Sequence, residues 1–188
     1  MTPDDPDDED HAATFSDFYH RERTRLFRFA AVVSPHLDHE SAVQEAFVSA
    51  WRNWPVIAAP SRRAWLVRTI RNLLVDQARR RERPGDVTDE ATVRQRGTYR
   101  ILLPRQRDAE TWHELISTLA AVVDLPDHLR TALVLRFWDF DDDEIADVLG
   151  CRRASVRRYV AEARARVSAR VGNQERRVRG SQRGKETS

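Results

Sequence analysis

Arginine recurs at helical spacing near the C-terminal end of the chain, a pattern that suits binding to a polyanion. In the segment "EIADVLGCRRASVRRYVAEARARV", Arg153 and Arg157 are four residues apart, and Ser155 and Arg158 flank them. Arg can pair with guanine through two hydrogen bonds or clamp a phosphate group. A basic helix that is merely solvated is the alternative interpretation. The spacing therefore predicts DNA contacts by Arg153, Ser155, Arg157 and Arg158.

The elements around these arginines have the pattern of a helix-turn-helix. Asp141 and Glu144 form an acidic variant of the capping box, so a short helix begins at about Asp142 and ends at Gly150. A second helix follows. In a helix-turn-helix, this second helix enters the DNA major groove. Its inward stripe consists of Val156, Val160, Ala163 and Val167. Two further helices are predicted before the motif, over 112–123 and 125–138, with Pro126 in the first turn of the latter.

An amphipathic helix is predicted over "SAVQEAFVSAWRNW", residues 41–54. Its apolar stripe follows the 3.6-residue period and is predicted to be buried. This stripe consists of Val43, Ala46, Phe47, Ala50, Trp51 and Trp54. Other side chains fall outside it, where they are either simply solvated or part of a docking surface. These are Gln44, Glu45, Ser49 and Arg52.

A basic helix is predicted to begin near Ala64, with a buried stripe of Leu66, Ile70, Leu73 and Leu74. Arg62, Arg63 and Trp65 lie where the preceding loop joins this helix. An aromatic ring beside two guanidinium groups suits stacking of an unpaired base and binding of its phosphate. An ordinary solvated basic face remains the alternative.

Charge and composition limit the class of protein. The 188-residue chain has a formal net charge of only +2, but acids cluster at its start and arginines at its end. No apolar run approaches the roughly 20 residues of a membrane span, and the acidic start does not resemble a signal peptide. We therefore predict a soluble, cytoplasmic protein without membrane insertion. Because Cys151 is the one cysteine, the chain cannot form an internal disulfide. We predict that its side chain fills space in the turn as a small apolar group.

Residue patterns typical of catalysis are missing from the sequence. We find no nucleophile beside a base, no Gly-rich phosphate loop and no paired catalytic carboxylates. His36 and His39 have i, i+3 spacing, but the nearby Pro35 and the absence of cysteine ligands argue against a metal site. The sequence predicts a protein that is not an enzyme and that needs no cofactor or metal.

The predicted fold is all-α, with two small helical domains joined by a flexible linker and a helix-turn-helix in the C-terminal domain. The linker is predicted where Pro84, Gly85, Gly97 and Pro104 interrupt the helical period. The expected organisation is an acidic disordered tail over 1–14, a helical domain over 15–83, the linker over 84–110, the helix-turn-helix domain over 111–171 and a basic disordered tail over 172–188.

Four motifs in this order resemble the successive motifs of extracytoplasmic-function RNA polymerase sigma factors. They are "SAVQEAFVSAWRNW", "AWLVRTIRNLLVDQARRR", "LPDHLRTALVLRFW" and the helix-turn-helix segment quoted above. The resemblance covers most of the chain, and order and spacing make it more specific than any one motif. Four positions depart from it, and two of these, Tyr159 and Glu162, stand where the family typically has basic residues. Ser41 stands where the family usually has an acid, and Arg152 stands where Ser or Thr usually caps the recognition helix.

The resemblance implies roles for the first block, the helical domain over 15–83, and for the C-terminal block, the helix-turn-helix domain over 111–171. The helix over 41–54 would dock on the clamp helices of the largest subunit of core RNA polymerase, through Gln44, Glu45, Ser49 and Arg52. The next loop and helix would open and read the downstream promoter element through Arg62, Arg63, Trp65, Arg68, Arg71 and Asn72. The C-terminal block would bind the upstream element as duplex. Members of this family are often held by an anti-sigma factor, which is a further expected partner beside promoter DNA.

Two other classes of protein share part of this pattern. A conventional helix-turn-helix regulator would bind duplex DNA without polymerase, but it would not explain the motifs of the first block. A helical adaptor that binds only protein would leave the basic recognition helix without a role.

Overall fold

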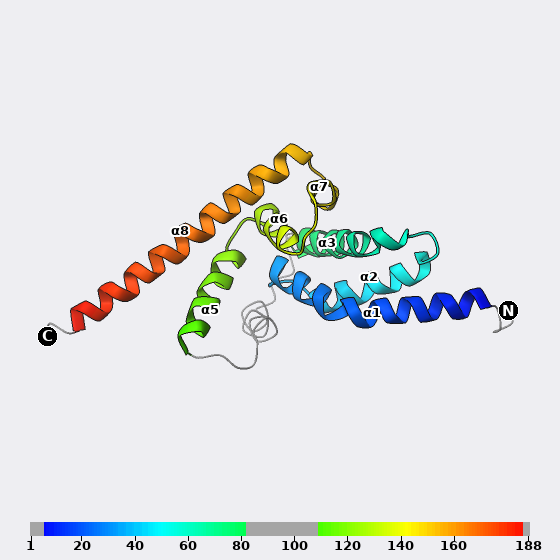
Figure 1. The fold of residues 1–188 in the computed structure, drawn as a ribbon, viewed down its shortest axis with the longest axis horizontal. Helices are drawn as coiled ribbons and strands as arrows, with labels where there is room; N and C mark the ends of the chain where they lie inside the picture. Colours follow the sequence, from blue (N-terminus) through cyan, green and yellow to red (C-terminus); the bar gives the residue numbers. More distant parts are fainter. Residues whose placement is uncertain (1–5, 82–108, 186–188) are drawn as a thin grey trace. The chain divides into compact units, whose positions relative to one another are not determined.

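The structure is a computed structural model, which describes residues 6–81 and 109–185. Every regular element in these ranges is helical (Figure 1). The chain divides into two compact units, Met1–Ile101 and Leu102–Ser188. The predicted all-α fold with a C-terminal helix-turn-helix is thus confirmed. The predicted linker, 84–110, lies outside the described residues except for its last two, with which the first helix of the second unit begins.

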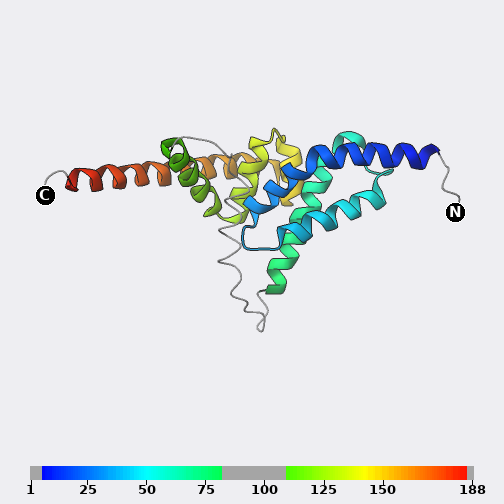
Figure 2. The same cartoon turned by 90° about the horizontal axis from the view of Figure 1, so that it is seen from below.

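The first unit consists of α1 (Pro6–Val33), α2 (His39–Asn53), the 3-10 turn η1 (Ala59–Ser61) and α3 (Arg62–Arg81). α2 packs against both α1 and α3, which the two cartoon views show from different sides (Figures 1 and 2). Apolar side chains from all three helices fill the space between them. The fully buried ones include Leu26, Phe29, Ala46, Trp54, Leu66, Ile70 and Leu74. This core fixes which face of α2 and of α3 remains open to solvent.

The apolar stripe of α2 is buried as predicted, with one exception. Val43, Ala46, Phe47, Ala50 and Trp54 are buried, whereas Trp51 is 41% exposed. Trp51 lies at the edge of the stripe and packs against Phe15 of α1, with ring centroids 5.1 Å apart. The prediction that Trp51 belongs to the core was therefore wrong. A stripe at helical spacing marks the buried face, but its edge residues face the boundary with solvent.

Helix α1 begins at Pro6, inside the segment predicted to be a disordered tail over 1–14. Side chains of its early turns contact residues in and directly after α2. The indole Nε1 of Trp54 donates a 3.1 Å hydrogen bond to Thr14 Oγ1, and the His11 ring lies 4.3 Å from that of Trp51. The acidic composition predicted disorder, but these tertiary contacts favour an ordered helix there.

The end of α3 is tied to the start of α2 through one amide side chain. Gln77 Oε1 accepts a 3.0 Å hydrogen bond from the backbone N–H of Asp38, and Gln77 Nε2 donates at 3.1 Å to the Asp38 carbonyl. The Asp38 carboxylate in turn caps α2 by accepting from the Ser41 N–H. The N-terminus of α2 is therefore held by both local and long-range hydrogen bonds.

The second unit consists of α5 (Ala109–Val123), α6 (Asp127–Phe137), α7 (Asp142–Leu149) and α8 (Arg153–Lys185), in the predicted order. α8 contacts each of the other three helices. Its buried stripe of Val156, Val160 and Ala163 agrees with the prediction, and Val167 packs at the margin. The long α8 is thereby anchored by its N-terminal half.

The two ends of α7 are set by two local devices that the sequence predicted. The Asp141 carboxylate accepts from the Asp143 and Glu144 N–H groups at 2.8 Å, and Glu144 Oε2 accepts from the Asp141 N–H at 2.9 Å. Gly150 ends α7 at φ 64°, in the left-handed region that disfavours residues with a Cβ atom. The capping box and the glycine together fix where α7 starts and stops.

Helix α8 continues to Lys185, through the segment predicted to be a basic disordered tail over 172–188. No proline interrupts this segment, and its Gln, Glu, Arg and Lys residues, which are good helix formers, outnumber its three glycines. Arg170 forms an ion pair with Asp124 at the end of α5, which extends the packed part of α8 toward the tail. None of the described helices combines the length and apolar character needed to cross a bilayer.

Candidate functional site

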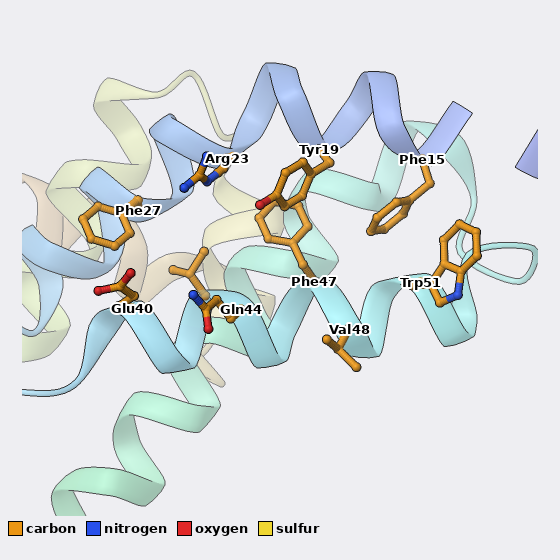
Figure 3. Close-up of a pocket in the computed structure, with 10 residues that line it drawn as sticks. Phe15, Tyr19, Arg23, Phe27, Glu40, Gln44, Phe47, Val48 and Trp51 are labelled. Carbon is orange, nitrogen blue, oxygen red and sulfur yellow. The ribbon is translucent and has the colours of Figure 1, made fainter. Parts of the chain in front are cut away.

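A groove opens on the first unit between α1 and α2, with a volume of about 480 Å³. We call it the α1–α2 groove. Figure 3 shows side chains of both helices converging on it. It is lined by Phe15, Tyr19, Arg23 and Phe27 of α1 and by Glu40, Val43, Gln44, Phe47, Val48 and Trp51 of α2. Most of its wall is apolar, with charged and amide groups at one end.

Aromatic contacts hold the walls of this groove in place. Tyr19 meets Phe47 edge to face at 4.7 Å between ring centroids, and Phe15 meets both Phe47 and Trp51 in the same manner. Such pairs favour defined ring orientations and add about 0.5–1.5 kcal/mol beyond the area they bury. The groove is therefore a preformed feature of the first unit.

Three of the four predicted polymerase-binding residues form one row on α2, and the fourth, Gln44, belongs to the neighbouring row that lines the groove. Glu45, Ser49 and Arg52 have i, i+4, i+7 spacing, and so do Gln44, Val48 and Trp51 of the groove row. Gln44, Glu45 and Arg52 are exposed and Ser49 is half-buried. Val48 is exposed by 51%.

Sequence reasoning missed the apolar half of this surface. Val48 was assigned no role and Trp51 was assigned to the core, whereas both line the α1–α2 groove. The contribution of α1 was also missed. The available signal was the i, i+4 spacing of Phe15, Tyr19, Arg23 and Phe27, of which all but Arg23 are aromatic.

On α3, part of the predicted downstream-element set shares one face. Trp65, Arg68 and Asn72 have i, i+3, i+7 spacing, opposite the buried Ile70 and Leu74. Arg68 and Asn72 are exposed and Trp65 is half-buried. Arg71 lies beside this row and is half-buried too. We call Trp65, Arg68, Arg71 and Asn72 the α3 face.

Arg62 and Arg63 lie in the first turn of α3 and do not extend the α3 face. The Arg62 guanidinium lies over the Trp54 ring, 3.7 Å from its centroid, and its Nε is buried without a hydrogen-bond partner. A guanidinium stacked on a buried indole stabilises the packing of η1 and α3 against α2. The structure thus gives Arg62 a structural contact within the unit, next to its predicted role toward DNA.

In the second unit, two predicted DNA-binding arginines of α8 meet the acidic first turn of α7. Arg157 Nε donates a 2.8 Å hydrogen bond to Asp142 Oδ2, and Arg153 Nη1 donates at 2.9 Å to Asp143 Oδ2. Arg153 Nε also lies 4.0 Å from Asp142 Oδ2. Arg136 of α6 binds the other oxygen of Asp142 and donates to the Phe140 carbonyl.

Asp142 is the centre of this charged cluster. Its side chain is only 10% exposed, whereas that of Arg157 is 73% exposed. The hydrogen bond from Arg157 lowers the pKa of the Asp142 carboxyl, and Arg136 adds to this effect, against the opposing effect of burial. Asp142 therefore stays ionised at neutral pH and holds the arginines from beneath.

The remaining predicted residues of α8 differ in exposure. Ser155 is half-buried in the first turn, while Arg158 is exposed and lies 5.4 Å from the centroid of the Tyr159 ring. Arg153, Arg157 and Arg158 thus present exposed guanidinium groups from adjacent turns, with Ser155 recessed between them.

Potential metal ligands do not gather anywhere in residues 6–81 and 109–185. His39 illustrates this, because its Nδ1 lies 3.2 Å from the Leu37 carbonyl and its ring packs edge to face on Phe27. The two histidines of the i, i+3 pair therefore lack further ligands among the described side chains. The arrangement fits binding surfaces on helices rather than a site for a bound ion.

Comparison with known proteins adds an independent finding. Residues 18–84 match the family Sigma-70 region 2. The sigma factor RpoE from Bartonella quintana, solved with the anti-sigma factor NepR, is similar with a TM-score of 0.61 and 21% identity, over 83% of this chain and 97% of that one. CnrH, solved with the cytosolic domain of CnrY, is similar with a TM-score of 0.55 and 24% identity, over 84% of this chain and 87% of that one. No curated protein sequence matches the chain.

Proposed function

We propose that this chain is a sigma factor of the sigma-70 family, that it binds core RNA polymerase through α2 and that it reads two promoter elements with its two units. The observation that carries the proposal is the composition of the α2 surface. An exposed polar row, Glu45 to Arg52, borders a preformed apolar groove with an exposed Val48 and Trp51. An apolar patch with a polar rim is the usual anatomy of a protein-binding surface.

On this proposal, Gln44, Glu45, Ser49 and Arg52 contact the clamp helices of the largest polymerase subunit. A partner helix laid along α2 would cover Val48 and Trp51 and meet the polar row at its edge, which is the helix-in-groove mode of recognition. The chain supplies no catalytic group of its own in this scheme, because nucleotide addition belongs to the polymerase.

The test is the affinity of the full chain for purified core polymerase. Gln44→Ala with Glu45→Lys should weaken binding by about tenfold or more, a loss of about 1.4 kcal/mol, while circular dichroism stays unchanged. The matched control is Asp17→Lys, a charge reversal at an exposed residue of α1 that does not line the groove. Equal affinities for the double mutant and the control would contradict the proposed docking surface.

We assign the melted downstream element to the α3 face. Base stacking on Trp65 and phosphate binding by Arg68 would offset the unpairing of a base, which costs a few kcal/mol. Arg68→Ala with Asn72→Ala should impair permanganate reactivity and transcription on duplex promoters more than on premelted templates. Equal losses on both templates would assign these residues to stability or general phosphate attraction. Arg62→Ala is the comparison, because its stacking on Trp54 predicts a stability loss instead.

A conventional regulator would behave differently in a binding experiment. Each unit offers a small DNA-facing surface, so the free chain should bind promoter duplex weakly and gain specificity only with core polymerase. Specific binding at nanomolar concentration by the free chain, at physiological salt, would favour a conventional helix-turn-helix regulator.

We further propose that an anti-sigma factor regulates the chain. This is supported by the similar solved structure of RpoE, which contains the anti-sigma factor NepR, and the similar structure of CnrH likewise contains a bound partner, the cytosolic domain of CnrY. A partner of this kind should compete with core polymerase for the chain. Simultaneous binding of both without loss of affinity would contradict this part of the proposal.

A further inference from the structure

The arginines that face DNA in the proposed function are already engaged by carboxylates, and they are engaged in two different ways. Asp142 binds Arg157 through Nε, 2.8 Å away, and the terminal amino groups of Arg157 make no hydrogen bond or ion pair within the described part of the chain. Asp143 binds Arg153 through Nη1, at 2.9 Å, while Arg153 Nε lies farther from Asp142 Oδ2, at 4.0 Å. The fork that recognises guanine or phosphate thus stays open on Arg157 and is partly occupied on Arg153.

The two carboxylates also differ in their surroundings. The Asp142 side chain is 10% exposed and is bound by Arg136 from its other side, so it cannot move away from α8 without breaking a second ion pair. The Asp143 side chain is 66% exposed and its partner Arg153 is 58% exposed. An exposed pair of this kind is weak and is easily exchanged for another anion.

We infer that the first turn of α7 sets the DNA affinity of α8, with Asp142 as a positioning residue for Arg157 and Asp143 as an internal competitor for Arg153. The inference rests on the proposed DNA-binding role of α8. Asp142 fixes the long Arg157 side chain before DNA arrives, so less side-chain freedom is lost on binding. Asp143 must be displaced from Arg153 by a phosphate or a base, which lowers the net gain from that contact.

Opposite effects of two similar substitutions follow from this difference. Asp143→Asn releases Arg153 and should strengthen DNA binding, with the salt dependence steepening by about 0.9 for one added phosphate contact. Asp142→Asn releases Arg157 from its fixed position and should weaken binding by about twofold to tenfold, since arginine has a large side-chain entropy to lose. Both variants remove one negative charge, so net charge alone predicts the same sign for both.

The experiment measures the affinity of the full chain for a fluorescent duplex of mixed sequence, by anisotropy over a series of salt concentrations. The matched control is Asp147→Asn, which removes an exposed carboxylate from the same helix, away from the arginine pairs. The gain from Asp143→Asn should exceed that of the control and should disappear when Arg153 is Ala. The loss from Asp142→Asn should disappear when Arg157 is Ala.

Asp142→Glu separates a loss of side-chain position from a loss of folding, because it keeps the negative charge and moves it by one methylene. It should retain the circular dichroism spectrum and still weaken binding. The inference is overturned if Asp142→Asn and Asp143→Asn both tighten binding as much as Asp147→Asn does. If instead Arg153→Ala and Arg157→Ala leave DNA affinity unchanged, the DNA-binding role of α8 in the proposed function fails as well.

Discussion

The α2 surface of the first unit and the α8 surface of the second are built in opposite ways. On α2, the exposed side chains border an apolar groove whose aromatic walls are held by one another. On α8, the exposed side chains are guanidinium groups held by carboxylates of α7. A surface for a protein partner gains most from apolar area that binding will cover, whereas a surface for a polyanion gains from charges fixed in position. The comparison suggests that each unit is preorganised for a different class of partner.

The largest expected effect tests whether the core beneath α2 can lose stability without any change in the helices that form the α8 surface. Trp54 is 2% exposed, donates to Thr14 and lies under Arg62, so Trp54→Ala should destabilise the first unit by about 3–5 kcal/mol. Hydrogen exchange measured by mass spectrometry should show lost protection in α1 to α3 and unchanged protection in α7 and α8. Trp51→Ala, at an exposed position, should lose less stability and more polymerase affinity. Joint loss of protection in both units would break the comparison.

A smaller effect tests the α8 surface itself. Arg157→Ala with Arg158→Ala should leave core polymerase affinity unchanged and reduce transcription from promoters that depend on the upstream element. Each lost base contact is expected to contribute about 1–3 kcal/mol, and each lost phosphate contact lowers the salt slope by about one. Promoter-specific transcription and core affinity are measured side by side. Arg166→Ala is the control, because Arg166 is exposed on the same helix and pairs with Glu162. Loss of core affinity in the folded double mutant would contradict the division of surfaces.

A third prediction concerns the turn that brings α7 to α8. Gly150 has φ 64°, and a Cβ atom there would meet nothing within 4 Å, so Gly150→Ala should act through backbone strain alone. We expect a loss of about 1–2 kcal/mol in the second unit, together with weaker DNA binding. Gly150→Asn should lose less, because Asn tolerates the left-handed conformation better. Chemical denaturation of both variants measures the difference, and equal losses would point to a cause other than backbone conformation.

The smallest effect concerns pH, and it should be confined to the second unit. The pKa of Asp142 is lowered in the folded chain, chiefly by the hydrogen bond from Arg157. The resulting stability is complete above the unfolded pKa of about 3.9 and is lost as the pH falls through the lower folded value. The effect is modest because Arg157 and Arg153 are largely exposed. Denaturation is measured from pH 2 to 7. The difference in free energy of unfolding between the wild type and Asp142→Asn should narrow only at acid pH. Asp147→Asn should not share this narrowing.

Sequence patterns predicted the parts of the fold that depend on local spacing. The buried face of α2, the Asp141–Glu144 capping box and the glycine at the end of α7 each follow from residues within a few positions of one another. The order of helices in the second unit followed from the same signals. These features were correct because the interactions that determine them are short-range.

Features that depend on distant contacts were missed. Trp51 was assigned to the core because its spacing fits the stripe, yet its position at the groove depends on where α1 lies. The pairing of Asp142 with Arg157 spans the whole helix-turn-helix and needs the turn geometry to be known. The early turns of α1 follow the same rule, since acidic composition gave no indication that Thr14 would meet Trp54. The roles of the candidate residues toward polymerase and DNA stay predictions.

The hydrogen bonds between Gln77 and Asp38 bear on the order of folding. They join residues 39 positions apart, and Asp38 is also the N-cap of α2. A contact of this span closes a long loop, so it forms late and lowers the folding rate relative to a chain with only local contacts. The Asp38 cap on Ser41 is local, but the two hydrogen bonds from Gln77 need α3 in place, so the start of α2 should gain its full set of hydrogen bonds together with α3. A nascent chain released before α3 is complete would therefore present α2 with a frayed start.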